Sequence, residues 1–443
     1  MTNQQLIIAK LKAGAMDTVK EAILDLIEDH DRKRLQKLQD YYDGKHDILK
    51  RPGEPSKPNN RIVNDFPGEI VDTAVGYFIG IPVAYKSDDD AFLEEVNRIR
   101  FINDEELHNE RLVVSMCTQG RSYELLYIDE NSEPRFMWVP ATEMILVYDG
   151  SAVDQVQYAL RYYPIIINGM PATKIELYDA AKVVYYILER NVLRLDDSEP
   201  QNPRPHYFGD VPVVEYRNNE AGMGDFEKVT TLVDEYNRHM SDVANEHEYF
   251  RNAYLLLRNL SGTDSEDLEA VKHSGAFLVD EDGDVKFITK DINDDAVEHH
   301  YERLDENIHK FSKTPDLTDE SFGGNLSGVA IKYKILELET KCISKERRML
   351  AGLRRRWTLI SNILNIKGHS FEPDTLRYEF RRNLPSNIQE EADTVNSLHG
   401  RISDETLFGM LSFVDDPQAE MERIKEERKG FVDLDGVDMD GDI

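Results

Sequence analysis

Apolar residues recur at helical spacing over the first part of the chain. Residues 1–43 carry them three or four positions apart among charged residues, which predicts helices. Three prolines within residues 50–60 then exclude a helix and predict an extended loop. The helical spacing resumes over residues 62–80, where a glycine and a following proline give a stop signal. We therefore expect this part of the chain to be helical, with one loop.

The spacing of apolar residues changes to two over residues 121–217. This stretch is rich in Val, Ile and Tyr, and Gly, Pro, Asn and Asp divide it into short runs. It therefore predicts a β-rich domain, and the short connections favour antiparallel pairing. The expected strands are 122–129, 135–139, 155–163, 173–178, 183–189 and 211–215.

Two later segments predict helical rods. From Phe226 to Leu257 the apolar positions step by three and four without a break, the 3.5-residue period of helices that pack side by side. This predicts a rod over residues 225–258, on the order of 50 Å long. A second helical pattern over residues 294–312 is a candidate partner for the rod, and so are other copies of the chain.

A small module is expected between the two rods, over residues 259–293. It contains one helical stretch, 265–273, and an expected β-hairpin of strands 276–279 and 285–289. The turn of that hairpin is rich in aspartate. An insertion at this point would be held at the far end of the rods.

The C-terminal part is again mainly helical. A long helix is expected over residues 327–366, and a strand over 375–381 that rejoins the β-rich domain. Residues 386–443 predict acidic helices. The final stretch, 431–443, holds five Asp and no basic residue, which predicts disorder.

The loop over residues 313–328 lies between the second rod and the long helix. Its tip, 322–328, is uncharged and contains three glycines. A flexible tip between two stiff helices predicts a moving part. The pattern gives no sign of a catalytic site.

The composition restricts the classes of function. A chain of 443 residues predicts two to four domains. The formal net charge of −32 argues against ordinary nucleic-acid binding, which needs a basic surface to displace counterions from phosphates. It permits a protein that lies near DNA without gripping it.

Cysteines and hydropathy suggest a compartment. Cys117 and Cys342 are far apart in the sequence and fall in apolar patterns, so we expect buried thiols and a reducing environment. The N-terminus has no signal-peptide layout, and no run of about 18 apolar residues predicts a transmembrane helix. The expected site of synthesis is the cytoplasm.

No pattern in the sequence predicts catalysis, a cofactor or a metal site. Gly323 and Gly324 lack the Gly-Lys-Ser/Thr that completes a phosphate-binding loop. His299 and His300 are adjacent on a helix and diverge by about 100°, too far for one metal ion. The aspartates at 280–284 lack the Gly and Glu of a calcium loop. Arginines within 347–356 are expected to pair with carboxylates of the chain, within one subunit or across subunits.

Five short motifs give the chain a family resemblance, and their shared order spans about residues 20–425. Together they resemble the portal proteins of tailed bacteriophages, of the siphovirus type that infects Gram-positive bacteria. The motifs are 41–46 (YYDGKH), 59–64 (NNRIVN), 76–83 (GYFIGIPV), 211–219 (VPVVEYRNN) and 315–330 (PDLTDESFGGNLSGVA).

The resemblance implies a division of the chain into the parts of an α+β portal fold. A ring of twelve such subunits would surround a central tunnel at one capsid vertex. The implied parts are a β-rich wing (1–224 with 366–385), a stem (225–258 and 294–312), a clip (259–293), a tunnel loop (313–328), a long tunnel-to-wing helix (327–366), and a crown with an acidic, disordered tail (386–443).

The resemblance also implies two sets of contact residues and no catalytic, metal or cofactor site. The DNA-facing set in the tunnel loop is Lys313, Thr314, Asp316, Thr318, Asp319, Glu320, Ser321, Phe322, Gly323, Gly324, Asn325 and Leu326. The clip set, which would contact the terminase or adaptors, is Asp264, Glu266, Asp267, Asp280, Asp282 and Asp284.

The implied partners belong to the phage particle. They are further copies of the chain, the large terminase subunit, head-completion adaptors, and the major capsid and scaffolding proteins. Double-stranded DNA would pass through the tunnel without sequence specificity, since an acidic wall repels phosphates. The location would be the portal vertex of the virion, with assembly in the host cytoplasm and no membrane contact.

Two other classes remain open from the residues alone. A cytoplasmic coiled-coil adaptor would use the rods to form dimers or small oligomers. A metal-dependent nuclease would use the Asp and Glu clusters, although these lie in turns and the tail and not on strands that converge at a pocket. Images of the purified protein separate the adaptor from a ring, and a divalent-dependent nuclease assay tests the enzyme.

Overall fold

The structure is a computed structural model, and the chain divides into two compact units. The larger unit comprises Met1–Asp316 and Glu337–Arg382, and the smaller one Leu317–Leu336 and Asn383–Ile443. The residues described are 2–55, 57–151, 155–250, 254–258, 284–288, 294–317, 328–383, 388–411, 413–414 and 417–434.

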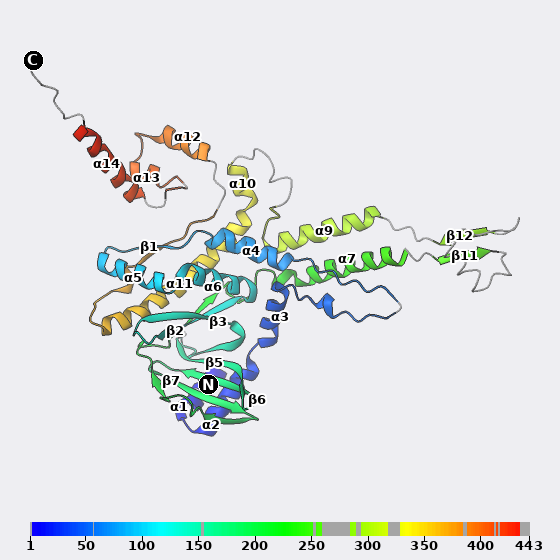
Figure 1. Cartoon of the computed structure of the whole chain (residues 1–443), viewed down its shortest axis with the longest axis horizontal. Helices are drawn as coiled ribbons and strands as arrows, with labels where there is room; N and C mark the ends of the chain where they lie inside the picture. The colour runs from blue at the N-terminus through cyan, green and yellow to red at the C-terminus, as the bar shows by residue number, and fades with distance from the viewer. Residues whose placement is uncertain are drawn as a thin grey trace, which may run out of the picture. The chain divides into compact units, whose positions relative to one another are not determined.

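The expected α+β class is confirmed, because helices and antiparallel sheets both contribute to the larger unit (Figure 1). Its largest sheet has the strand order β4-β5-β6-β7-β8, with a short β9 paired to β7. Every pairing in it is antiparallel, as the short connections predict. These strands are β4 (Met144–Tyr148), β5 (Val156–Ile167), β6 (Met170–Tyr178), β7 (Lys182–Glu189), β8 (Val192–Leu195) and β9 (Arg204–Pro205).

Two N-terminal helices pack on this sheet. Helices α1 (Asn3–Ala13) and α2 (Met16–Asp29) bury their apolar stripes against it, with Ile23 fully buried beside Leu160 and Ile175. Burying one aliphatic side chain contributes about 1.5–3 kcal/mol, so this core ties the start of the chain to the sheet. The sequence pattern predicts these helices and predicts β-strands, but it does not predict that the helices pack on this sheet.

A second core joins this sheet to a smaller one of order β10-β2-β3. Helix α3 (Arg32–Tyr42) contributes Leu35 to that core. The expected strands of the β-rich region are confirmed, while β4, β8 and the two-residue β9 were missed. The run in β4, MILVY, is continuously apolar and shows no alternation, and β8 has four residues. The strands of the smaller sheet are β10 (Val213–Arg217), β2 (Arg121–Ile128) and β3 (Pro134–Val139).

Helix α4 (Phe66–Ile79) begins later than the expected start at residue 62. The carboxylate of Asp65 accepts a hydrogen bond from the backbone N–H of Gly68 at 3.1 Å, and so caps the helix. Pro67 follows in the first turn, where a proline needs no intrahelical partner. The cap therefore fixes the helix start, and residues 62–65 are not helical. Two further helices follow in the chain, α5 (Asp90–Ile102) and α6 (Glu105–Gln119).

The expected strand over 375–381 forms, but it does not rejoin the large sheets. Strand β13 (Arg377–Glu379) pairs antiparallel with β1 (Ala84–Lys86) in a separate two-stranded sheet. The prediction of where it pairs was therefore wrong. A three-residue pattern carries no information about its partner, which comes from a distant part of the chain.

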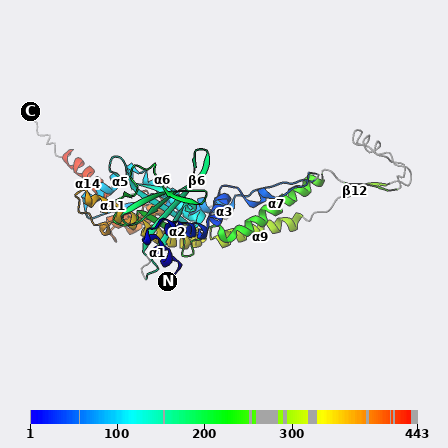
Figure 2. The same ribbon diagram turned by 90° about the horizontal axis from the view of Figure 1, so that it is seen from below.

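Helices α7 (Thr230–Phe250) and α9 (Asp294–Ser312) lie side by side, as both views show (Figures 1 and 2). The rings of Tyr236 and Tyr301 meet across them with centroids 5.3 Å apart. The expected rod over 225–258 is shorter, because α7 ends at Phe250. Residues 254–258 form strand β11 (Tyr254–Arg258). The helical spacing of apolar residues extends into this segment, although the segment is a strand. Periodicity alone therefore placed the end of the rod too late.

The expected clip hairpin lies mostly outside the described residues. Its second strand is confirmed as β12 (Asp284–Ile288). Within the described part of the chain, the partner of β12 is β11, in an antiparallel pair. The helix expected over 265–273 and the strand over 276–279 are not among the described residues.

The long helix expected over 327–366 is divided. A single residue, Ile335, separates helix α10 (Gly328–Lys334) from helix α11 (Leu336–Ile366). The apolar stripe expected on α11 is confirmed by burial. The buried residues on that stripe are Leu338, Cys342, Met349, Leu353, Trp357, Ile360 and Leu364.

The smaller unit contains α10 and three C-terminal helices, which confirms the expected helical character of this region. Helix α14 ends at Leu434, so 431–434 are helical and the disorder expected there was wrong. None of the helices in the described ranges is long and apolar enough to span a bilayer. The three helices are α12 (Ile388–Leu398), α13 (Asp404–Phe408) and α14 (Pro417–Leu434).

Candidate functional site

The end of α9 forms a fixed corner at the base of the predicted tunnel loop. Lys313 adopts φ +58°, a left-handed conformation that ends helices. The N–H of Thr314 then donates to the carbonyl of His309 at 3.2 Å. We call residues 312–316 the loop base. It turns the chain sharply out of α9.

Lys341 of α11 holds the loop base in place. Its ammonium group donates to the carbonyl of Ser312 at 3.1 Å and to Oγ1 of Thr314 at 3.0 Å. It also lies 3.4 Å from Asp225, just before α7. One cation therefore connects the start of the first rod, the end of the second and the long helix.

A buried ion pair reinforces this junction. Nζ of Lys345 lies 2.7 Å from Oδ1 of Asp225, and both side chains are almost completely buried. Burial alone would raise the pKa of Asp225, but the charges of Lys345 and Lys341 lower it on balance to well below its usual range. The aspartate is thus held ionised, and it cannot leave the pair without stranding a buried charge.

The described residues of the predicted DNA-facing set differ in exposure. Lys313 is exposed, whereas Thr314 is 1% exposed and bonded to Lys341, so its side chain is turned into the subunit. Asp316 is half-buried beside α4 and α9. The rest of the set, from Thr318 to Leu326, lies outside the described residues.

Of the predicted clip contacts, Asp284 is the first residue of β12. The other clip residues, from Asp264 to Asp282, lie outside the described ranges. Their role as a docking surface stays a prediction.

A cluster of possible metal ligands beside the loop base was missed by sequence reasoning. Glu69, His309 and Asp316 place one ligand atom each within 4.8 Å of the others. They come from α4, from α9 and from the segment after α9. No spacing in the sequence links them, so only the fold could have found them.

Three arginines of the basic run of α11, Arg348, Arg355 and Arg356, pair with carboxylates of their own chain, as expected. Arg356 is fully buried and makes ion pairs of 2.7 Å with Glu105 and with Glu124. Arg355 lies 3.0 Å from Asp210. These arginines anchor α11 to neighbouring elements, and their guanidinium groups are occupied there.

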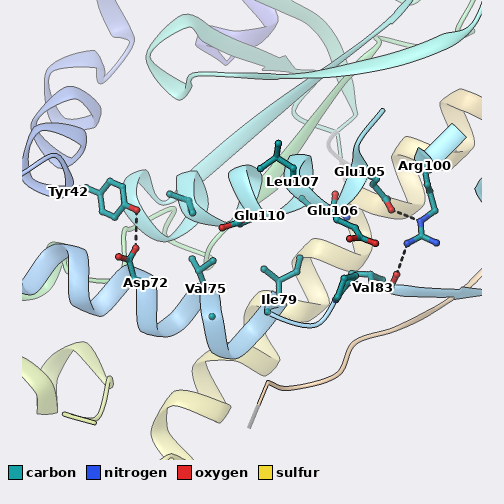
Figure 3. A pocket seen from close by; sticks show the side chains of 15 residues that line it. Tyr42, Asp72, Val75, Ile79, Val83, Arg100, Glu105, Glu106, Leu107 and Glu110 are labelled. Atoms are coloured by element: carbon teal, nitrogen blue, oxygen red, sulfur yellow. Dashed lines mark hydrogen bonds and ion pairs between the residues drawn. The ribbon is translucent and has the colours of Figure 1, made fainter. Parts of the chain in front are cut away.

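A cavity with a volume of about 680 Å³ lies between α4 and α6 (Figure 3). The hydroxyl of Tyr42 donates to Asp72 at 3.0 Å at one end. At the other end Arg100 donates to Glu105 at 2.6 Å and to the carbonyl of Val83. These polar groups bond to one another across the walls, which suits a structural cavity more than a catalytic one.

Comparison with known proteins assigns the class of protein. The family described as "Phage portal protein, SPP1 Gp6-like" matches residues 22–431. The chain belongs to this SPP1 Gp6-like family of phage portal proteins. It is a family of structural proteins, the head-to-tail connectors at the portal vertex of the virion.

Two relatives agree with this assignment. The portal protein of Bacillus phage SPP1 is 30% identical over 443 residues, covering 94% of this chain and 87% of that protein. The portal protein of Clostridium phage phiCD119 is 25% identical over 426 residues, covering 90% and 93%. The family resemblance expected from the five motifs is confirmed.

Solved structures show a more distant likeness. A chain of the neck of a native GTA particle, a structure computed with C12 symmetry, matches with a TM-score of 0.47 and 11% identity, over 79% of this chain and 90% of that one. A chain of the neck of an empty GTA particle matches with a TM-score of 0.45 and 11% identity, over 81% and 89%. The family assignment rests on the sequence comparisons.

Proposed function

We propose that copies of this chain form a closed ring at one capsid vertex, with residues 313–328 of each copy facing DNA in the central tunnel. In this arrangement α7 and α9 are the stem, residues 259–293 the clip, and residues 386–443 the crown. The ring is the channel through which the genome enters during packaging and leaves during ejection.

One observation carries this proposal. Hydrogen bonds from α11 hold the loop base in place, while its basic residue stays exposed. Lys341 binds Ser312 and Thr314 from the side of α11, and Lys313 between them is exposed. A loop that starts from such a fixed corner keeps its position under load. Its exposed ammonium group can make weak, transient contacts with passing phosphates.

Exposed apolar residues near the corner support packing against neighbouring copies. Phe311 is 54% exposed at the end of α9, and Ile343 on α11 is 40% exposed. Large apolar side chains in the open are typical of surfaces that another chain covers. In a ring, each copy would cover the next through the same pair of surfaces.

The charge of the chain supports a passage and not a binding site. A net charge of −32 repels phosphates from most of the surface. A DNA duplex therefore finds no deep attractive site in which to stop. Lys310 in the last turn of α9 and Lys313 in the loop base are the basic residues that we assign to transient contact.

The partners follow from this position in the particle. The clip would dock the large terminase subunit during packaging and the head-completion adaptors afterwards, while capsid and scaffolding proteins surround the ring. The ring itself would catalyse nothing, and the terminase would supply ATP hydrolysis. Assembly would take place in the host cytoplasm.

The variant Lys313→Ala tests the role of the loop base, with Lys313→Arg as the matched control. Both residues must adopt the same positive φ, so the comparison isolates the charge. We expect K313A to assemble rings normally but to change the amount of DNA packaged or retained, and K313R to behave as the parent. Particle yield, DNA content and images of the isolated ring are measured together.

Two results would contradict this proposal. Loss of the ring in K313A would make the residue a structural one. Unchanged packaging and retention in K313A would remove Lys313 from the DNA path.

A further inference from the structure

Three side chains beside the loop base meet from separate segments. Glu69 lies in the first turn of α4, His309 in the last turn of α9, and Asp316 four residues beyond the end of α9. One ligand atom of each lies within 4.8 Å of the other two. The three lie within one compact unit of the chain.

His309 is oriented as a metal ligand is. Its Nδ1–H donates to the carbonyl of Thr314 at 3.2 Å, which leaves the lone pair on Nε2. Nε2 lies 3.6 Å from Oδ1 of Asp305, and the side chain is 10% exposed. Phe66 meets the ring edge to face at 5.9 Å. A backbone carbonyl on Nδ1 is the outer contact that fixes the tautomer of metal-binding histidines, and an ion on Nε2 would replace its contact with Asp305.

The charges around the cluster favour an added cation. The carboxylates of Asp305, Glu69 and Asp316 lie around the imidazole of His309. A divalent ion at the cluster would add positive charge beside these three carboxylates.

We propose that Glu69, His309 and Asp316 bind one divalent transition-metal ion of the Zn²⁺ class. One imidazole and two carboxylates are ligands that Zn²⁺ takes at about 2.0–2.2 Å, which places tetrahedral ligand atoms about 3.4 Å apart. Binding would require the side chains to rotate until their ligand atoms, now within 4.8 Å of one another, reach that spacing. Mg²⁺, which prefers an all-oxygen octahedron, fits the imidazole poorly.

Binding would fasten the loop base from a second side. Lys341 already holds Ser312 and Thr314 to α11, and the ion would tie Asp316 and the end of α9 to α4. The effect of the ion on the tunnel loop rests on the proposed function. Metal binding itself does not depend on that function, so an experiment can refute either claim without refuting the other.

Titration with Co²⁺ in excess Mg²⁺ tests the site, because Mg²⁺ occupies the general acidic surface and Co²⁺ reports its ligands through visible absorbance. We expect one Co²⁺ per chain, displaced by Zn²⁺. His309→Gln and Asp316→Asn should each weaken binding at least about tenfold. Asp316→Asn lies beyond the helix and leaves α9 intact.

Two exposed residues on α9 give the matched controls, His299→Gln and Glu306→Gln. Both should bind Co²⁺ as the parent does, and Zn²⁺ should raise the melting temperature of the parent but not of H309Q. Absence of a one-to-one Co²⁺ complex in the parent would overturn the proposal. So would full-affinity binding in folded H309Q or D316N.

Discussion

Two cations on α11 are fully buried, and each is neutralised by carboxylates from other elements. Lys345 pairs with Asp225, and Arg356 pairs with Glu105 and Glu124. Buried charges of this kind need their partners, because an unpaired ion in the interior is strongly destabilising. The long helix is therefore held by specific pairs as well as by its apolar stripe.

The first prediction concerns the Lys345 pair. Lys345→Ala leaves Asp225 buried without its main cation and should lower the free energy of unfolding by about 3–5 kcal/mol. Arg348→Ala is the control, since its partner Glu220 is 88% exposed and such a pair contributes about 1 kcal/mol or less. Urea unfolding followed by circular dichroism measures both. Equal losses would contradict the account.

The second prediction is a loss of stability in acid. Burial alone would raise the pKa of Glu124, but the charge of Arg356 and the hydrogen bond with His108 lower it on balance from 4.5 to about 2. A depressed pKa contributes stability that is complete above the unfolded value and is lost as the pH falls toward the folded value. The melting temperature should therefore fall between about pH 4.5 and pH 2.

Glu124→Gln should flatten this acid limb, because the amide does not titrate in that window. The control is Glu302→Gln, at a side chain that is 62% exposed. Melting temperatures across the acid range decide the matter. An acid limb as steep in E124Q as in the parent would exclude Glu124 as its source.

The sequence predicted that the arginines of α11 pair with the chain's own carboxylates, and it could go no further at this scale. Glu105 and Glu124 reach Arg356 from α6 and β2, which no local pattern relates to α11. The cluster at Glu69, His309 and Asp316 was missed for the same reason. Local spacing reports which face a residue is on, and not which distant residue meets it.

At the scale of elements, period and capping give different information. The spacing of apolar residues predicted the helices and most strands. It placed the end of the first rod too late, because α7 ends at Phe250 and residues 254–258 form a strand. The start of α4 depended on a single cap by Asp65. The pairing of β13 with β1 was out of reach, because a three-residue strand takes its partner from the tertiary fold.

The third prediction tests how α11 packs on β10. A methyl group at Gly352 would overlap the ring of the buried Tyr216, so Gly352→Ala should destabilise the protein by about 1–3 kcal/mol. Gly76→Ala on α4 is the control, because nothing lies within 4 Å of the added methyl group. It should be neutral or stabilising by up to about 1 kcal/mol. The same sign in both variants would contradict the close packing.

At the scale of the whole molecule, the chain has the features of a subunit of a larger assembly. Its family is that of phage portal proteins, and we assign the exposed Phe311 and Ile343 to contact between copies. The motifs were sufficient to predict the family from the sequence. The number of copies in a ring depends on contacts between chains, which no pattern within one chain determines.

The central claim is that copies of this chain close into a ring around a tunnel. Negative-stain electron microscopy of the purified protein tests it most directly. We expect particles seen end-on as rings with a stain-filled central hole, with the wings radiating outward. Particles that are uniformly dimers or small rods without a hole, as a coiled-coil adaptor would give, would contradict the account.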